Sequence, residues 1–260
     1  RYGVGYDNID LEYTNSKGIF VCNTPDYGVD EVSDTAVAMI LNIARGVTRY
    51  DYLSRGYGKN WQENTIASIK RTSKTIVGVV GAGRIGGSVL LKCAALGFDT
   101  VFFDPYKASG HEKMLNARRV ESLEELLADS DIVSLHAPLS DETRGMVKPE
   151  FFALMKEGAS LVNTARGGLI AHLDDFYEPL KSGRLACASL DVIPDEPPPE
   201  KGLMIEAWRT RSDWLDGRFI INPHTAYFSD SAYYEMRSKA AQNALRVLQG
   251  CRPINIVNGL

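Results

Sequence analysis

The sequence predicts an α/β fold built on a doubly wound parallel sheet. From about Thr75 onward, apolar runs of strand length alternate with amphipathic stretches of helix length, and this alternation is typical of βαβ units. The composition is that of a globular protein, since 44% of the 260 residues are hydrophobic and 24% are charged. A glycine-rich turn at residues 81–86 follows the first apolar run directly, and such a turn lets a helix fold back onto a strand.

Six apolar runs are the predicted strands of this sheet. They comprise residues 75–80, 100–104, 132–136, 160–163, 186–191 and 219–222. Helices are expected between them, and Ser122 with Glu125 three residues later predicts a capping box at the start of one helix. Gly97, Gly158 and Gly183 each occupy a position where a helix C-terminal cap is expected.

Two segments lie outside the alternation and predict a second, incomplete domain of the flavodoxin-like kind. Residues 1–23 give a turn-rich opening, a short helix and a strand at residues 18–22, and residues 229–250 carry the apolar stripe of one long helix. The expected division is a first domain at residues 29–228 and a second made of residues 1–28 and 229–260. Because the chain opens at Arg1 without a methionine, we expect the N-terminal part of the second domain to lie upstream.

A long amphipathic helix is predicted over residues 31–50. Its wide apolar stripe contains Val32, Thr35, Ala36, Met39, Ile40 and Ile43. Packing against the core of the protein is the favoured interpretation of this stripe. Part of it is also suited to the interface of a homodimer, which we expect to involve this helix region.

Charge and cysteine content exclude several classes of protein. The net charge is −4 and no block of like charge is present, so direct binding of nucleic acid is not expected. No apolar run approaches the roughly 20 residues that span a bilayer. The four cysteines are far apart and form no C-x-x-C pair, which favours reduced core thiols in a cytoplasmic or nuclear compartment.

The glycine-rich turn has the spacing of a dinucleotide-binding loop. In Gly81-Ala-Gly83-Arg-Ile-Gly86, the first glycine permits the tight turn, the second lets the backbone approach a pyrophosphate, and the third lets the helix lie close to the strand. The amide groups at the helix start then face the phosphates. Asp104 ends the next strand, where its carboxylate can accept the ribose hydroxyls and repel a 2′-phosphate. The alternative, a tight turn without a ligand, is disfavoured by this combination, and NAD rather than NADP is the expected cofactor of a Rossmann domain.

Three further side chains are candidates for catalysis. Taken alone, Arg166 is an ordinary salt-bridge residue, Glu196 a loop acid and His224 a half-buried histidine. Each, however, lies at or just after the end of a predicted strand, the edge where open α/β sheets bind ligands. We therefore expect His224 to act as general acid/base with Glu196 as its partner, and the guanidinium of Arg166 to anchor a carboxylate and the neighbouring carbonyl. No metal ligands are assigned.

The successive motifs resemble those of the D-isomer-specific 2-hydroxyacid dehydrogenase family over nearly the whole chain. These motifs are Gly5-Tyr-Asp-Asn-Ile-Asp10, the glycine loop, His136-Ala-Pro-Leu, Val162-Asn-Thr-Ala-Arg-Gly-Gly168, Leu190-Asp191-Val, Asp195-Glu196-Pro197 and Asn222-Pro-His224. The resemblance implies hydride transfer between NAD and a small 2-keto or 2-hydroxy acid, with Arg166, Glu196 and His224 as the catalytic group. It also implies cofactor contacts from Gly81, Gly83, Arg84, Ile85, Gly86, Asp104, Pro138, Thr143, Thr164, Ala165, Arg166, Asp191 and His224. Asp191 would face the nicotinamide amide, and Val4 and Gly5 would bind substrate together with Arg166.

A narrower similarity leaves a second function open. Val21-Cys-Asn23, Phe103-Asp-Pro-Tyr106 and Ala226-Tyr-Phe-Ser are similar to the C-terminal-binding-protein (CtBP-like) branch, whose members are NAD-responsive transcriptional corepressors. A corepressor-like protein that binds NAD(H) with little or no turnover is thus the alternative to an enzyme. Formate dehydrogenase is less similar, because that subfamily has glutamine at the position of Glu196.

Several positions depart from the family pattern. Ala171-His172-Leu replaces the usual acid-rich helix start, Pro179 should kink the following helix, and Tyr227 stands where the corepressor branch has tryptophan. His111 and His172 are interpreted as surface residues. We expect residues 1–260 alone to bind NADH but to reduce 2-keto acids weakly, because the lobe that closes over the substrate begins upstream.

Overall fold

The computed structural model describes residues 1–56, 61–62, 65–66 and 68–260. The chain divides into two compact units. The central unit is Ser33–Ala226, and the terminal unit combines Arg1–Val32 with Tyr227–Leu260. The residues that carry the predicted nucleotide and catalytic sites belong to the central unit.

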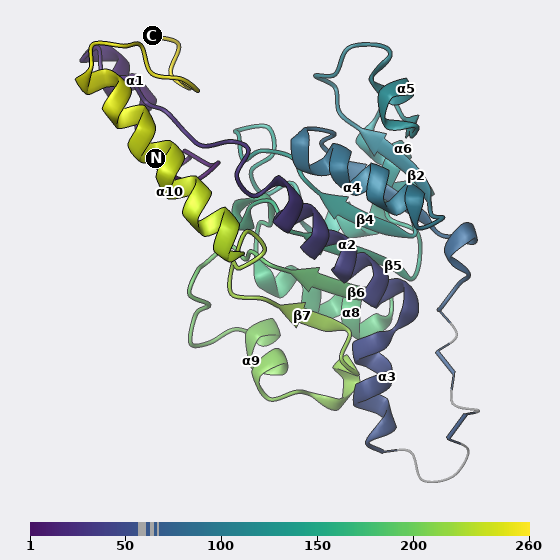
Figure 1. Ribbon diagram of the computed structural model, residues 1–260. Coiled ribbons are helices and arrows are strands. Elements are labelled where there is room, and N and C mark those ends of the chain that lie inside the picture. Colours follow the sequence, from purple (N-terminus) through teal and green to yellow (C-terminus); the bar gives the residue numbers. More distant parts are fainter. Residues whose placement is uncertain (57–60, 63–64, 67) are drawn as a thin grey trace. The chain divides into compact units, whose positions relative to one another are not determined.

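Within the described residues, the central unit contains one seven-stranded sheet with the order β3-β2-β1-β4-β5-β6-β7 (Figure 1). The strands are β1 Ile76–Val80, β2 Asp99–Phe103, β3 Arg118–Arg119, β4 Ile132–Leu135, β5 Ala159–Asn163, β6 Leu185–Leu190 and β7 Phe219–Ile221. Neighbouring strands pair in parallel, and the chain reverses its direction of progress across the sheet between β1 and β4. The doubly wound parallel sheet predicted from the sequence is confirmed, and its reversal point is where such sheets bind ligands.

All six predicted strands are present, and each boundary lies within one residue of the expected position. The short strand β3 was not predicted. Its two residues pair with Val101 and Phe102, and a pair of charged residues gives no alternating apolar pattern from which a strand could be predicted.

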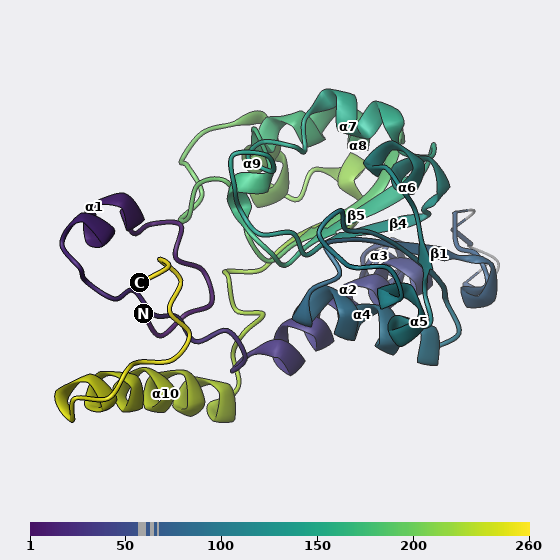
Figure 2. The same ribbon diagram turned by 90° about the horizontal axis from the view of Figure 1, so that it is seen from above.

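Helices cover both faces of this sheet (Figure 2). The helices of the central unit are α2 Val29–Arg45, which begins in the terminal unit, α3 Val47–Ser54, α4 Arg84–Ala95, α5 His111–Leu115, α6 Leu123–Asp129, α7 Pro149–Leu154, α8 Tyr177–Ser182 and α9 Leu203–Arg209. Short 3-10 turns occur at Thr72–Lys74, Gly167–Leu169, Leu173–Phe176 and Asp213–Leu215. One buried cluster joins α2 and α4 to β1, with Ile40, Val79 and Leu90 inside it. A second joins α6, α7 and α8 to the other face, with Leu127 and Phe152 inside it.

The single helix predicted over residues 31–50 is wrong, because the chain forms two helices there. Gly46 separates α2 from α3 and has a left-handed backbone, with a φ of 63° that favours glycine. A Cβ at this position would lie 2.6 Å from Cδ1 of Ile69, so the break is also closely packed. Ala36, Met39 and Ile40 are buried within the central unit, which confirms core packing as the role of the stripe.

The predicted helix caps are confirmed in part. The backbone N–H of Glu125 donates to Oγ of Ser122 at 3.1 Å, as expected at the start of α6. Gly183 ends α8 with a φ of 82°, and Gly97 follows the end of α4 with a φ of 87°. Gly158 is not a cap, because α7 ends at Leu154 and Gly158 belongs to the turn that leads into β5.

The terminal unit contains α1 Leu11–Ser16 and the long helix α10 Asp230–Leu248. Ser229 caps α10 by accepting a hydrogen bond from the N–H of Ala232 at 2.9 Å, so the predicted C-terminal helix is confirmed. The strand predicted at residues 18–22 is wrong. Only Cys22 makes an isolated antiparallel bridge, to Ile256, and the Asn258 side chain bonds this segment at Ile19 O and Val21 N.

One of the four cysteines is exposed, and none of the described helices is a candidate membrane span. The four cysteines are free thiols, and Cys251 is exposed although all four were expected in the core. Within the described residues, every helix is too short or too polar to serve as a membrane span.

Candidate active site

The glycine loop connects β1 to α4 at the reversal point of the sheet. Gly81 has a φ of 90°, and a Cβ there would lie 2.8 Å from the backbone nitrogen of Ala137. A Cβ at Gly86 would lie 2.0 Å from the carbonyl oxygen of Gly81. Both glycines are therefore required by the packing of the loop against its own strand and against the segment after β4.

Gly83 has a different reason to be glycine. Among the residues that the structure describes, none has an atom within 4 Å of a Cβ placed on Gly83, and the backbone φ of −77° is accessible to any residue. Neither steric contact with these residues nor backbone strain explains the glycine. It lies at the N-cap of the 12-residue helix α4, where open space and unsatisfied amides suit a pyrophosphate.

Asp104 is held against this loop at the end of β2. Its Oδ2 accepts a hydrogen bond from the N–H of Ala82 at 2.9 Å, and its Oδ1 accepts one from Tyr106 N at 3.0 Å. The residue is buried. The carboxylate thus occupies the expected place beside the glycine loop with its orientation fixed by two backbone donors.

His111 also contacts the loop, which corrects its interpretation as a surface residue. Its Nε2 lies 2.9 Å from the carbonyl oxygen of Ala82, and its ring packs edge-on against Phe102 at a centroid distance of 6.1 Å. A carbonyl oxygen can only accept, so Nε2 carries the proton and donates. This contact could not be predicted from a local pattern, because His111 lies 29 positions from Ala82, at the start of α5.

The remaining predicted cofactor residues follow the C-terminal ends of β1, β4, β5 and β6. Arg84 and Ile85 open α4, and Thr143 donates from its Oγ1 to the carbonyl of Pro138 at 2.6 Å. Thr164 and Ala165 come directly after β5. Within the described residues, the buried Oγ1 of Thr164 has no hydrogen-bond partner, and a buried hydroxyl in that state is suited to a ligand. The open space at Gly83, the fixed carboxylate of Asp104 and this hydroxyl together fit a dinucleotide.

Arg166 is presented by a loop that Asn163 organises. The buried side chain of Asn163, the last residue of β5, donates to the carbonyl of Arg166 at 2.9 Å and accepts from the N–H of Ala165 at 3.0 Å. Arg166 Nη1 donates to the carbonyl of Ala165 at 2.7 Å. The motif alone does not predict the role of Asn163 in shaping the loop, which is evident from these contacts.

The two glycines after Arg166 are required by close packing of its loop. A Cβ at Gly167 would lie 1.8 Å from the carbonyl oxygen of Ile193, and one at Gly168 would lie 2.8 Å from Cδ2 of Leu139. The glycines let the loop pack onto the segments that follow β6 and β4. This packing positions the backbone of Arg166 indirectly.

Glu196 and His224 are joined by a direct hydrogen bond of 2.7 Å between Oε2 and Nδ1. A carboxylate accepts, so Nδ1 carries the proton and Nε2 is the nitrogen that can exchange a proton with a substrate. The other carboxylate oxygen of Glu196 accepts from Ile193 N at 3.0 Å, which orients the acid. The side chains are 36% and 48% exposed, so the pair is accessible to a small molecule.

The pair shifts the pKa of both partners toward their charged forms. The hydrogen bond to Glu196 raises the pKa of His224 above its ordinary value, although partial burial opposes this. Burial alone would raise the pKa of Glu196, but the hydrogen bonds from His224 and Ile193 and the charge of Arg166 bring it below its usual value. Both shifts therefore favour an imidazolium beside a carboxylate over the neutral pair.

Asp191 holds the loop that carries the histidine. Its two carboxylate oxygens accept the N–H groups of Thr225 and Ala226, each at 3.0 Å, and its carbonyl accepts from the N–H of His224 at 2.9 Å. Burial raises the pKa of Asp191 despite these bonds. With both oxygens engaged by the backbone, the buried carboxylate of Asp191 has a structural role in addition to the nicotinamide contact implied by the resemblance.

The other histidines do not offer the same proton chemistry. Burial lowers the pKa of His136 to about 3, so it stays neutral, with Nε2 2.8 Å from Oγ of Ser134. His172 is exposed, as expected from the sequence, and His111 is bound to the glycine loop. His224 is the histidine that combines a carboxylate partner with an accessible position.

Val4 and Gly5 belong to the terminal unit. The carbonyl of Val4 accepts from Nδ2 of Asn23 at 2.8 Å, and the carbonyl of Gly3 accepts from the N–H of Thr24 at 3.1 Å. These bonds order the short segment on which the expected substrate contacts lie.

Comparison with known proteins agrees with this site. Residues 37–226 match the family described as "D-isomer specific 2-hydroxyacid dehydrogenase, NAD binding domain". The chain is 35% identical over 259 residues to D-3-phosphoglycerate dehydrogenase of Methanocaldococcus jannaschii, covering 99% of this chain and 47% of that protein. It is 34% identical over 260 residues to glyoxylate reductase of Korarchaeum cryptofilum, covering 99% of this chain and 75% of that protein. The chain thus spans about half the length of the first relative and three quarters of the second.

A solved structure shares the fold. The D-lactate dehydrogenase of Aquifex aeolicus, crystallised with NAD and lactic acid, is similar to this chain with a TM-score of 0.79 and 30% identity. The similarity covers 96% of this chain and 75% of that one. Since the family match extends over most of the central unit, the chain belongs to the D-isomer specific 2-hydroxyacid dehydrogenase family and carries its NAD-binding domain.

Proposed function

We propose that the protein is an NAD-dependent oxidoreductase that transfers a hydride between the nicotinamide and C2 of a D-2-hydroxy acid or the matching 2-keto acid. The observation that carries the proposal is the 2.7 Å hydrogen bond between Glu196 and His224. It lies at the sheet edge that also bears the glycine loop. An acid-supported histidine beside a nicotinamide site is the arrangement that alcohol oxidation requires at neutral pH.

In the reduction direction, His224 donates the Nε2 proton to the carbonyl oxygen of the keto acid. Glu196 stabilises the imidazolium before the transfer and keeps Nδ1 protonated throughout. Arg166 pairs its guanidinium with the substrate carboxylate and holds the reacting carbon in place. When bound, the nicotinamide supplies the hydride in this direction and accepts it in the reverse direction, for which His224 takes up the hydroxyl proton.

Substrate selection follows from the same groups. A guanidinium fork binds a planar carboxylate with two parallel hydrogen bonds, so an acid with an adjacent carbonyl is the substrate class. We propose Val4 and Gly5 as additional backbone donors to that carboxylate. Judged from the names of the relatives above, the first compounds to assay are glyoxylate, pyruvate and the 2-keto acid formed by oxidation of 3-phosphoglycerate.

A corepressor-like protein that binds NAD(H) with little turnover is the alternative, and it rests on short motifs alone. The relatives compared above are named as dehydrogenases or as a reductase. These names and the intact hydrogen-bonded pair of Glu196 and His224 both favour an enzyme over a corepressor-like protein. A homodimer through the 31–50 region and a cytoplasmic location stay predictions.

Turnover by the full-length protein tests the proposal. NADH oxidation should be followed by the loss of NADH absorbance with each of the three keto acids. His224→Ala should lower kcat at least roughly a hundredfold, the scale of one general acid. The matched control is His172→Ala, which removes an exposed histidine and should leave kcat unchanged. Normal turnover in His224→Ala would exclude the mechanism, and NADH binding with no turnover in the unaltered protein would favour the alternative.

A further inference from the structure

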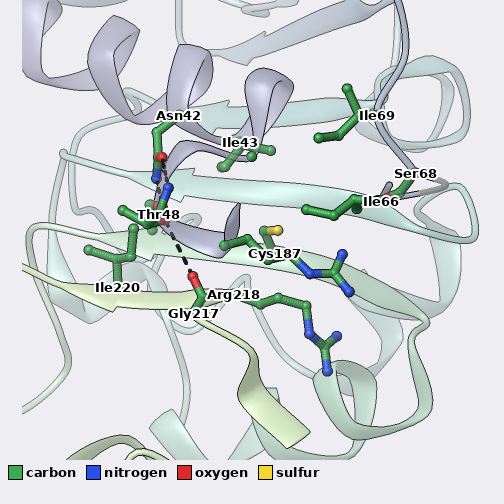
Figure 3. A pocket seen from close by; sticks show the side chains of 13 residues that line it. Asn42, Ile43, Thr48, Ile66, Ser68, Ile69, Cys187, Gly217, Arg218 and Ile220 are labelled. Carbon is green, nitrogen blue, oxygen red and sulfur yellow. Dashed lines mark hydrogen bonds between the residues drawn. The ribbon is translucent and has the colours of Figure 1, made fainter. Parts of the chain in front are cut away.

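The cavity between the α2–α3 junction and the strands β6 and β7 is a packing feature (Figure 3). It encloses about 20 Å³, room for about one water molecule. The Asn42 side chain bonds Thr48 twice, at 2.9 and 3.0 Å, and Oγ1 of Thr48 donates to the carbonyl of Gly217 at 3.4 Å. The guanidinium of Arg218 donates to three backbone carbonyls. These bonds join α2 and α3 to the segment before β7.

The nucleotide loop, in contrast, is held by a histidine that has no assigned function. Ala82, the residue between the first two glycines of the loop, is buried. Its N–H donates to Oδ2 of Asp104 at 2.9 Å, and its carbonyl oxygen accepts from Nε2 of His111 at 2.9 Å. Two side chains from separate elements therefore hold the two polar backbone groups of this one residue.

The bond from His111 also fixes the direction of the next amide. A trans peptide unit is planar, and its C=O and N–H groups point in opposite directions. The unit between Ala82 and Gly83 is trans. Because its carbonyl is turned toward His111, the N–H of Gly83 faces away from the imidazole.

This peptide unit stands where the pyrophosphate is expected. Gly83 is the N-cap of α4, and the described residues leave the space beside its Cα open. Amide groups at such a helix start bind phosphate best when they already point toward it, because orienting them on binding costs affinity. An anchor on the Ala82 carbonyl keeps the loop in one orientation before the cofactor arrives.

The helix α5 holds His111 in place for this role. Its ring packs edge-on against Phe102 at a centroid distance of 6.1 Å. Leu115, one turn further along α5, is buried in the cluster that joins α2 and α4 to β1. Gly110 is the N-cap of α5 and has a left-handed φ of 95°, which favours glycine. These contacts leave Nε2 of the imidazole to bind the Ala82 carbonyl.

We propose that His111 is a positioning residue for the cofactor, which holds the Ala82–Gly83 peptide in the orientation that the pyrophosphate of NAD requires. The inference rests on NAD binding by the loop and does not depend on which keto acid is reduced. Without the donor, the carbonyl of Ala82 is free to turn, and a smaller fraction of the molecules has a loop ready to bind. The apparent Kd rises by the same factor as that fraction falls.

Two variants separate the hydrogen bond from the packing of the ring. His111→Phe keeps a ring against Phe102 but has no donor, whereas His111→Gln supplies an amide donor of similar reach without a ring. In fluorescence titrations of the full-length protein, His111→Phe should weaken NADH binding about fivefold, the value of one hydrogen bond, and His111→Gln should stay within about twofold. The matched control is His172→Phe, which replaces an exposed histidine and should leave the Kd unchanged.

Displacement of bound NADH by ADP and by adenosine locates the effect on the cofactor. ADP contains two linked phosphates, so it should lose affinity for His111→Phe by the same factor as NADH. Adenosine has no phosphate and should bind His111→Phe and the unaltered protein equally. An equal loss of affinity for adenosine and ADP would overturn the assignment to the pyrophosphate.

A third variant keeps the test decisive if calorimetry shows that His111→Phe does not fold. His111→Met also lacks a strong donor, and its flexible side chain adapts to irregular spaces. Equal NADH affinity in the unaltered protein and in the folded donor-free variant would overturn the proposal. An equal loss in His111→Phe and His111→Gln would also overturn it, since the ring and not the donor would then matter. Failure of the unaltered protein to bind NADH would instead refute the cofactor site as a whole.

Discussion

Replacing the glycines of the nucleotide loop one at a time should separate folding from cofactor binding. Gly86→Ala places a Cβ 2.0 Å from the carbonyl oxygen of Gly81, a backbone atom that cannot move without disturbing β1. Gly83→Ala places a Cβ in open space at an ordinary φ of −77°. We therefore expect Gly86→Ala to lose stability and Gly83→Ala to lose NADH affinity with the fold intact.

The magnitudes follow from these distances. Overpacking costs about 1–3 kcal/mol, and a contact with the backbone places Gly86→Ala at the upper end. At about 2–4 °C per kcal/mol for a domain of this size, its Tm should fall by roughly 6–12 °C. Gly83→Ala should be neutral or gain up to about 1 kcal/mol, because alanine restricts the unfolded chain. Its NADH affinity should fall at least roughly tenfold, about 1.4 kcal/mol, since the methyl group occupies the pyrophosphate position.

Calorimetry and NADH fluorescence titration measure the two effects separately. Gly87→Ala is the control, because its Cβ would lie 3.2 Å from Cδ2 of Leu115, the movable end of a side chain, and both properties should change little. Unaltered NADH affinity in Gly83→Ala would refute the inference that the pyrophosphate approaches this backbone. A normal Tm in Gly86→Ala would refute the packing argument.

Three further substitutions test the site. Glu196→Gln should lower the pKa of His224, because the charged acceptor is lost, so the decline of keto-acid reduction with rising pH should occur at lower pH in kcat/KM profiles. An unmoved decline would contradict the pairing. Asp104→Asn should narrow the preference for NADH over NADPH roughly tenfold in binding titrations, because the charge that repels a 2′-phosphate is removed. An unchanged ratio of the two affinities would count against Asp104 as the residue that selects NADH. Arg166→Lys should raise KM for the keto acid roughly tenfold in steady-state assays, because lysine lacks the planar fork, and an unchanged KM would exclude a bidentate contact.

The sheet was predictable because its strands are buried on both faces. Runs such as residues 132–135, which are apolar except for Ser134, predict a central parallel strand. The errors occur where burial is weak. Residues 18–22 are apolar, but their backbone is hydrogen-bonded by the Asn258 side chain and not by a neighbouring strand. The break between α2 and α3 depends on a single glycine, Gly46, inside a strong helical pattern.

The sequence predicted which residues form the candidate site and which strand end each of them follows. The motifs located Arg166, Glu196 and His224, but contacts between distant loops carry no local pattern. The bond from His111 to Ala82 and the clamp of Asn163 on Arg166 are examples. These contacts depend on how the turns pack against each other, which sequence spacing does not determine.

The position of His224 depends more on its backbone than on its side chain. Its φ of 55° is unusual for a residue with a side chain and costs on the order of 1 kcal/mol or more. Asp191 offsets this cost, since its carbonyl accepts from His224 N and its carboxylate accepts from the next two amides. The loop can therefore hold the imidazole in place while the ring stays 48% exposed and its Nδ1 donates to Glu196. A histidine fixed through buried packing would be less accessible and, like His136, would have its pKa lowered by burial. Holding the backbone instead leaves the ring accessible to substrate and its pKa raised, the two properties that a general acid requires.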